Sequence, residues 1–330
     1  MKLTLTILTF VFSVLSTHSQ QIVITKQKKR SLSKYSVQLN PNTKERVTPD
    51  QELTEKSNQS SFNFHYSAYL KSDAANKNYS ALLLAYGIDS TNSELYYELA
   101  KYHEVNQNEK EKDRFCVKLK SANLTAALRE YAYNTLVSVE KNGVLITYGE
   151  RDTYPIWVLQ TTENFRTDVQ VLNYDLLLNE GYRNRKSKEL GIRFSRKYSE
   201  PIDLLKEIGP RNENKSIYYS LTVSHLVLKE LKSDLYATGL ALKFSKKELD
   251  NLSVLRTNWE KNFLKQELSK SKFVEIDNQL HLNYILPLIQ LVSLYEKELE
   301  TAKAEETKKL IHQLASMAGK EKAVKQILSK

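Results

Sequence analysis

The most constraining feature of this chain is a change of hydrophobic period after Gly143. Before this glycine, apolar residues recur every three or four positions, as in amphipathic helices. After it come a short apolar run at Val144–Tyr148, a helix-type stretch at Tyr154–Glu163 and a second apolar run at Val169–Leu172. A strand, a helix and a strand within about thirty residues form a βαβ unit, whose strands are parallel with a right-handed crossover. The pattern therefore predicts a small parallel α/β sheet.

Two more apolar runs, Ile217–Val223 and Tyr236–Phe244, flank a helix-like segment at Ser224–Lys232. They raise the expected sheet to about four strands. A further helix is expected to begin near Asp175, and from Ser245 onward the pattern is helical again. The expected fold class is thus mixed α and α/β.

The region before the sheet contains two apolar stripes at helical spacing. Their members are Ala81, Leu84, Ala85 and Ile88, then Leu95, Tyr96, Leu99, Ala100 and Tyr102. The turn between them, 89–92, is expected to end one helix and cap the next. The pattern resembles a degenerate tetratricopeptide repeat, with Ala85 at a small position and Tyr96 at an aromatic one. A plain helical bundle is the alternative, and a further helix is expected at Thr125–Glu140.

The first twenty residues have the order of a secretory signal peptide. Lys2 precedes an apolar run at Leu3–Leu15, and small and polar residues follow. A buried N-terminal helix is the alternative. We expect cleavage near residue 20 and export, most simply to a periplasm or to the outer-membrane region. No cysteine lies near the cleavage site, so a lipoprotein is not expected.

Residues 21–61 are polar and include Pro41 and Pro49, which predicts a disordered arm. Four basic residues in this arm are expected to belong to a solvated tail, and contact with anionic lipid is the less favoured alternative: Lys26, Lys28, Lys29 and Arg30.

The composition excludes several classes. Cys116 is the only cysteine, so no intramolecular disulfide can form and a packed core has to stabilise the fold. The net charge of +10 comes from lysines that alternate with glutamates, as on a solvated helix face. A nucleic-acid partner is therefore not expected. The histidines are scattered, so neither a metal site nor a bound cofactor is expected.

The segment Gly149–Trp157 follows the first strand and opens the next helix. Ligands of open parallel sheets bind at the carboxyl ends of strands, where helix N-termini present free N–H groups. Gly149 permits a tight exit from the strand, and Asp152 or Thr153 can cap the helix. A well-capped turn without a ligand is the alternative. The ligand-binding hypothesis names residues at neighbouring strand ends: Gly149, Glu150, Asp152, Thr153, Asn173, Asp175, Thr222 and Ser224.

The same segment resembles one in the soluble C-terminal region of polytopic membrane proteins related to protein O-mannosyltransferases, common in Bacteroidetes-type bacteria. The resemblance continues in Arg166–Val169, Leu172–Leu177 and Ile217–Ser224 and covers roughly 143–263. Glu150 and Arg151 depart from that family's loop, and its membrane-spanning part has no counterpart here. The resemblance implies a stand-alone relative of the accessory domain, without transferase chemistry.

These observations divide the chain into five regions. They are a signal peptide at 1–20, a polar arm at 21–61, tetratricopeptide-like helices at 62–142, a small α/β domain at 143–245 and C-terminal helices at 246–330. They leave three hypotheses for its function. The first is a non-catalytic scaffold or binding protein with an envelope protein as partner, contacted by tyrosines of the helical region: Tyr96, Tyr97 and Tyr102. The second is a glycan- or phosphosugar-binding accessory protein that uses the strand-end residues. The third is a hydrolase that uses the same loop, although the Gly-x-Ser-x-Gly motif is absent.

Overall fold

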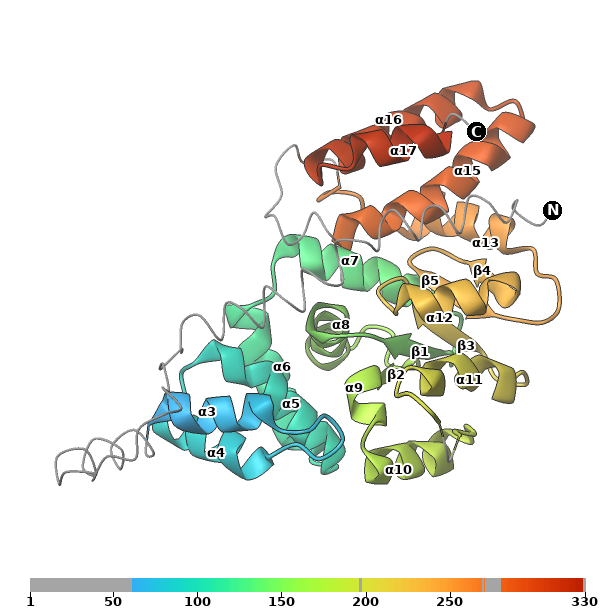
Figure 1. The fold of residues 1–330 in the computed structure, drawn as a ribbon. Helices are drawn as coiled ribbons and strands as arrows, with labels where there is room; N and C mark the ends of the chain where they lie inside the picture. Colours follow the sequence, from blue (N-terminus) through green and yellow to red (C-terminus); the bar gives the residue numbers. More distant parts are fainter. Residues whose placement is uncertain (1–60, 196–197, 269, 271–279, 329–330) are drawn as a thin grey trace, which may run out of the picture. The chain divides into compact units, whose positions relative to one another are not determined.

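Figure 1 shows the fold as a computed structural model, which describes residues 61–195, 198–268, 270 and 280–328. The chain divides into two compact units, one that ends at Ala122 and one that begins at Asn123. We call them the helical unit and the sheet unit. The expected signal peptide, the arm up to residue 60 and the basic residues within it lie outside the described residues.

The helical unit consists of two helical hairpins, in which α3 packs on α4 and α5 packs on α6. Asn92 caps the short 3-10 helix η1, which leads into α5, so the turn between the hairpins agrees with the prediction. The bounds are α3 Phe62–Lys71, α4 Tyr79–Ile88, η1 Ser93–Leu95, α5 Tyr96–Val105 and α6 Glu109–Ala122.

The buried face of α4 differs from the expected stripe. Ala81, Leu82 and Ala85 are buried, whereas Leu84 and Ile88 are exposed. The sequence of α4 is apolar almost all round, so its periodicity did not identify the face that meets the core.

In the described residues of the sheet unit, five strands form a sheet in the order β2-β1-β3-β5-β4. β1 pairs in parallel with both β2 and β3, which agrees with the predicted βαβ unit, while β5 is antiparallel to β3 and to β4. The mixed α and α/β fold class is confirmed. The strands are β1 Val144–Thr147, β2 Gln170–Asn173, β3 Ile217–Ser220, β4 Leu235–Ala237 and β5 Ala241–Phe244.

A tight turn at Gly239 divides the segment that was expected to form one strand at Tyr236–Phe244. Gly239 has a φ of 147°, and a Cβ atom there would lie 2.2 Å from the Ser138 hydroxyl oxygen. Only glycine fits this position, and the chain reverses there into the β4–β5 hairpin.

Helices cover both faces of the sheet. Leu145 of β1 and Tyr218 of β3 pack with residues of α7 and α8 on one face. On the other face the Tyr219 hydroxyl donates to the Leu205 carbonyl of α11 at 2.9 Å. The helices that surround the strands are α7 Ala126–Val137, α8 Glu150–Glu163, α9 Tyr174–Leu177, α10 Glu180–Leu190, α11 Asp203–Arg211 and α12 His225–Glu230, with a 3-10 turn η2 at Lys232–Asp234.

The C-terminal helices belong to the same unit. Two polar side chains of α7, spaced four residues apart, connect it to the segment 264–268. Glu130 accepts hydrogen bonds from the amides of Glu267 and Leu268, and Asn134 pairs with the backbone of Leu264. The remaining elements are α13 Asn251–Thr257, the π-helix η3 Asn258–Asn262, the 3-10 helix η4 Leu282–Tyr284, α15 Ile285–Lys297, α16 Thr301–Met317 and α17 Glu321–Leu328.

None of the helices in the described part of the chain has the length and apolar character that a membrane-spanning helix needs.

Candidate functional site at the strand ends

The loop after β1 is shorter than expected, because α8 begins at Glu150. Gly149 is the N-cap residue of α8 and has a φ of 85°, a positive value that favours glycine. Asp152 and Thr153 therefore lie in the first turn of α8, and neither is the cap residue that was predicted. Their side chains instead point to neighbouring strand ends.

Asp152 connects the start of α8 with the end of β3. Its carboxylate accepts hydrogen bonds from the Tyr148 amide at 2.9 Å, the Ser220 hydroxyl at 2.8 Å and the Thr222 hydroxyl at 2.6 Å. The side chain is almost completely buried, and this burial raises its pKa from 3.8 to about 6. Three donors thus compensate for removing a carboxylate from water.

Thr153 is the centre of a second buried cluster, which connects β1 with β2. Its hydroxyl donates to the Gly149 carbonyl at 2.7 Å and accepts from the Asn173 amide at 2.9 Å. The Thr147 hydroxyl lies 2.8 Å away and serves as a second donor, because the one proton of Thr153 is already used. Asn173 also caps α9 by accepting from the Leu176 amide.

The other predicted ligand-binding residues belong to neither cluster. Ser224 caps α12 by accepting from the Leu226 amide, while Glu150 and Asp175 are half-buried. The structure therefore brings Asp152 and Thr222 into one cluster and Thr153 and Asn173 into another. That these residues contact a ligand stays a prediction.

Sequence reasoning missed Ser220 and Thr147, which complete the two clusters. Both are the last residues of their strands, so the rule that selected Asn173 applies to them as well. It also missed a stacked pair of tyrosines, Tyr148 and Tyr174, whose ring centres are 5.2 Å apart. Burial, with nearby Asp175, raises the pKa of both phenols.

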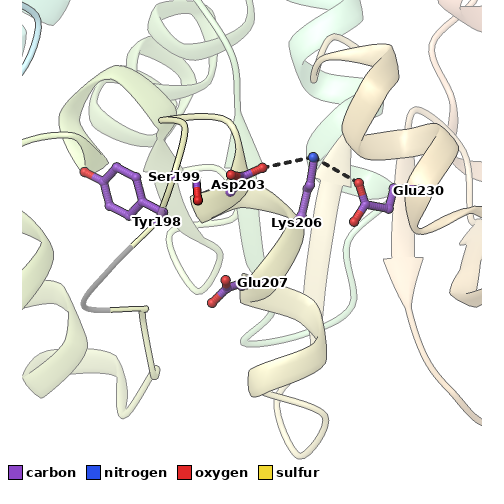
Figure 2. A pocket seen from close by; sticks show the side chains of 6 residues that line it. All are labelled: Tyr198, Ser199, Asp203, Lys206, Glu207 and Glu230. Carbon is purple, nitrogen blue, oxygen red and sulfur yellow. Dashed lines mark hydrogen bonds and ion pairs between the residues drawn. The ribbon is translucent and has the colours of Figure 1, made fainter.

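A cavity of about 380 Å³ lies beside α11, and neither Asp152 nor Asn173 lines it (Figure 2). At the strand ends themselves, the buried oxygens and nitrogens are directed at one another. This arrangement stabilises the edge of the sheet and does not present these two side chains to a ligand.

Arg166 and Asp168, which stand in the segment before β2, also make structural contacts. The Arg166 guanidinium donates to the carbonyls of Leu136 and Glu140 at the end of α7 and pairs with Asp168. Asp168 accepts from the Asn142 amide just before β1. The pair therefore connects α7 with the starts of β1 and β2.

In the helical unit, Tyr96 and Tyr97 are largely buried and Tyr102 is half-buried. The Tyr96 hydroxyl donates to the Thr91 carbonyl, and the ring of Tyr102 lies 5.0 Å from that of Tyr79. Their proposed contact with a partner stays a prediction.

No group of three or more His, Cys, Asp or Glu side chains in the described ranges is placed to hold a metal ion.

Comparison with known families finds a match to the TMEM260-associated domain 2 over residues 128–191. The matched region begins within α7 and ends just after α10. It includes Asp152, the Thr153 cluster and the Arg166–Asp168 pair, whereas Ser220 and Thr222 of the Asp152 cluster lie outside it. No curated protein and no solved structure matches the chain.

Proposed function

We propose that this chain is a non-catalytic binding or scaffold protein that acts through contacts with another protein. The observation that supports the proposal is an apolar face on α4, formed by Leu83, Leu84 and Ile88. Their side chains are 40%, 54% and 50% exposed. Contiguous exposed apolar residues are typical of protein contact sites.

The partner segment that fits this face is an amphipathic helix. Leu84 and Ile88 are four residues apart and form a ridge along α4, and such ridges pack against the grooves of another helix. No residue of α4 is charged, so the contact relies on apolar burial. Helical repeats bury their outer faces against a neighbouring repeat, so a short array of two hairpins leaves such faces for a partner.

The setting of this contact follows from the sequence. If residues 1–20 direct export, the partner is an envelope protein in the periplasm or at the outer membrane. The family match is consistent with a finer proposal, namely that the chain is a relative of the accessory domain of O-mannosyltransferase-like membrane proteins. It would then assist protein O-glycosylation without performing the transfer.

Capture from the envelope fraction of the source cells tests this proposal. The paired change Leu84→Glu and Ile88→Glu is expected to abolish recovery of a specific partner. Val117→Glu is the matched control, because Val117 is also exposed, at 54%, but lies on α6. Equal recovery of the partner by the wild type, the paired variant and Val117→Glu would contradict the proposal. Recovery of a second copy of this chain as the partner would contradict it as well.

The half-buried ring of Tyr148, which stacks on the buried ring of Tyr174, favours glycan binding as a second candidate function, because a tyrosine offers an apolar ring and a hydroxyl to a sugar. Glu150 and Asp175 would accept hydrogen bonds from its hydroxyls. Asp152→Ala is a poor test, because Asp152 is structural, so we choose Tyr148→Ala and Asp175→Asn. Binding to a glycan array that is unchanged in both variants would remove this candidate.

A further inference from the structure

α10 departs from the alternation of lysine and glutamate that is typical of this chain. Its segment 183–188 contains four basic residues and no acidic residue. The described residues before it, 61–178, include twelve basic and fifteen acidic side chains, so they carry no excess of positive charge. Figure 1 shows α10 at the end of the sheet unit opposite to α15–α17. The positive charge of α10 is therefore local to one end of this unit.

The fold brings two more basic residues to the C-terminal end of α10. Gly191 ends the helix with a φ of 61°, and a Cβ atom there would lie 3.2 Å from the Lys215 ammonium nitrogen. The buried Asn212 side chain accepts from the Arg193 amide at 2.7 Å and donates to the Arg193 carbonyl at 2.9 Å. Lys215 and Arg193 thus lie close to the last turn of α10, which contains Lys188.

Basic side chains exceed acidic ones at this end of the helix. Arg185 and Lys186 share one carboxylate, that of Glu189, at 3.8 and 3.2 Å. Within the described ranges, no ion pair involves Lys188, Arg193 or Lys215. The surface that these groups form keeps a net positive charge. We call it the basic face, and its members are Arg185, Lys186, Lys188, Arg193 and Lys215.

Acidic residues of the neighbouring segments have partners of their own. Glu213, which stands two residues before Lys215, pairs with Lys246 at 2.7 Å. Glu207 of α11 pairs with Arg211 at 2.6 Å. Glu180 lies at the other end of α10, in its first turn. These carboxylates therefore do not neutralise the basic face.

The backbone at this position disfavours a tightly held small anion. The C-terminal end of a helix presents carbonyl oxygens, not free N–H groups, and it is the negative end of the helix dipole. A phosphate ion would meet only side-chain charges, which lie along a helical turn and the loops after it instead of around one point. Positive charge that is spread out in this way suits an extended anionic surface.

The side chains also distinguish a lipid surface from an acidic protein. Protein interfaces have an apolar core inside their polar rim. No large apolar side chain is exposed in 180–195, a segment that the structure describes throughout. Lysine and arginine bind an anionic bilayer without such a core, and each strengthens the binding about fivefold.

We propose that the basic face binds the surface of an anionic phospholipid bilayer by electrostatic attraction, without inserting into it. The C-terminal end of α10 would then be directed toward the lipid phosphates. This contact is independent of the proposed protein contact at α4, which belongs to the other compact unit.

Sedimentation with lipid vesicles tests the proposal. Vesicles of equal parts phosphatidylglycerol and phosphatidylcholine are expected to bind the purified chain, and added salt should weaken the binding. Vesicles of phosphatidylcholine alone should bind much more weakly, and they measure any contribution of the apolar residues in 1–20. Equal binding to both vesicle types would overturn the proposal. Tighter binding to soluble polyglutamate than to the anionic vesicles would overturn it in favour of an acidic protein.

Variants with opposite expected effects make the test specific to α10. The paired change Lys188→Gln and Arg193→Gln should weaken binding to the anionic vesicles about 25-fold, because two exposed charges are lost. Glu189→Gln should strengthen it about fivefold, because the acidic side chain beside the basic face loses its charge. The N-terminal segment is the same in all of these proteins, so its basic residues cannot explain a difference.

The matched control removes the same charge at the opposite end of the sheet unit. Lys297 ends α15 and Lys309 lies in α16, and both are exposed. Lys297→Gln combined with Lys309→Gln should bind the anionic vesicles like the wild type. Equal weakening in the control and in the α10 variant would show that only the total charge matters. That result, or unchanged binding by the α10 variant, would contradict a membrane contact through the basic face.

Discussion

The carboxylate of Asp152 accepts a hydrogen bond from the hydroxyl of Thr222 at 2.6 Å, although the two residues are 70 positions apart in the chain. This contact joins the first turn of α8 to the loop after β3. Together with the Thr153 cluster, it connects the carboxyl ends of all three parallel strands. The distinctive loop at 149–155 thus has a clear role in stability, whatever else it does.

Replacing Asp152 with alanine should destabilise the protein by about 3 kcal/mol, because the Tyr148 amide and the Ser220 hydroxyl lose a buried acceptor. Asp152→Asn should cost much less, since its carbonyl oxygen can keep two of the bonds. Urea unfolding measures the free energy of unfolding of both variants. Equal stabilities of wild type and the alanine variant would show that the cluster does not support the fold.

The pH dependence of stability provides a second test of Asp152. Burial raises its pKa from 3.8 to about 6, so the folded state binds the proton more tightly than the unfolded chain. Its contribution is complete below pH 3.8 and is lost as the pH rises through 6, a change of about 3 kcal/mol.

The pH dependence of the unfolding free energy has to be compared between wild type and Asp152→Asn, because protonation of His281 changes the stability in the opposite direction. Burial lowers the pKa of His281 from 6.5 to about 4, so its contribution is lost as the pH falls through that range. The difference in unfolding free energy between wild type and Asp152→Asn should fall from pH 4 to 6 and then stay level. A flat difference across this range would exclude the raised pKa.

Asn134 pairs with both backbone groups of Leu264, each at 2.8 Å, and donates to the Tyr284 hydroxyl. Asn134→Leu should therefore cost about 3 kcal/mol and speed hydrogen exchange at the Leu264 amide. Thr135→Val is the matched control, because the Thr135 hydroxyl bonds only within α7, to the Tyr131 carbonyl. Similar losses in the two variants would contradict this explanation.

Gly239→Ala should destabilise the protein by more than about 2 kcal/mol, because its φ is positive and a Cβ atom would meet Ser138 and Phe263. Gly87→Ala is the control. Gly87 lies within α4 with open space around it, so alanine there should stabilise the helix by about 0.5–1 kcal/mol. Thermal unfolding distinguishes the two, and a tolerated alanine at 239 would argue against the hairpin geometry.

The sequence predicts the parallel part of the sheet well, because the change of period at Gly143 is local. It does not predict α11, because a helix of nine residues with Pro210 near its end provides little sequence in which to recognise a helical period. It also misses the β4–β5 hairpin, because the reversal depends on the close approach of Gly239 to Ser138, the C-cap residue of α7, which is distant in the sequence.

The sequence also predicts the candidate site only in part. The rule that polar residues gather at strand ends selects Asp152, Thr153 and Asn173 correctly as neighbours. The same rule applies to Ser220 and Thr147, but it does not show that their hydroxyls would satisfy Asp152 and Thr153, because the choice of hydrogen-bond partners depends on the packed geometry. Whether a polar cluster faces a ligand or itself depends on burial, and a single sequence does not contain that information.

The most direct measurement of the proposed function is site-specific photo-crosslinking in the source cells. A photoreactive amino acid replaces Leu84 on α4 in one protein and Val117 on α6 in another, since both side chains are 54% exposed. If a partner helix binds α4, position 84 should yield one discrete adduct with another protein, and position 117 should yield none. The same adduct at both positions, or none at either, would contradict a protein-binding role for this face.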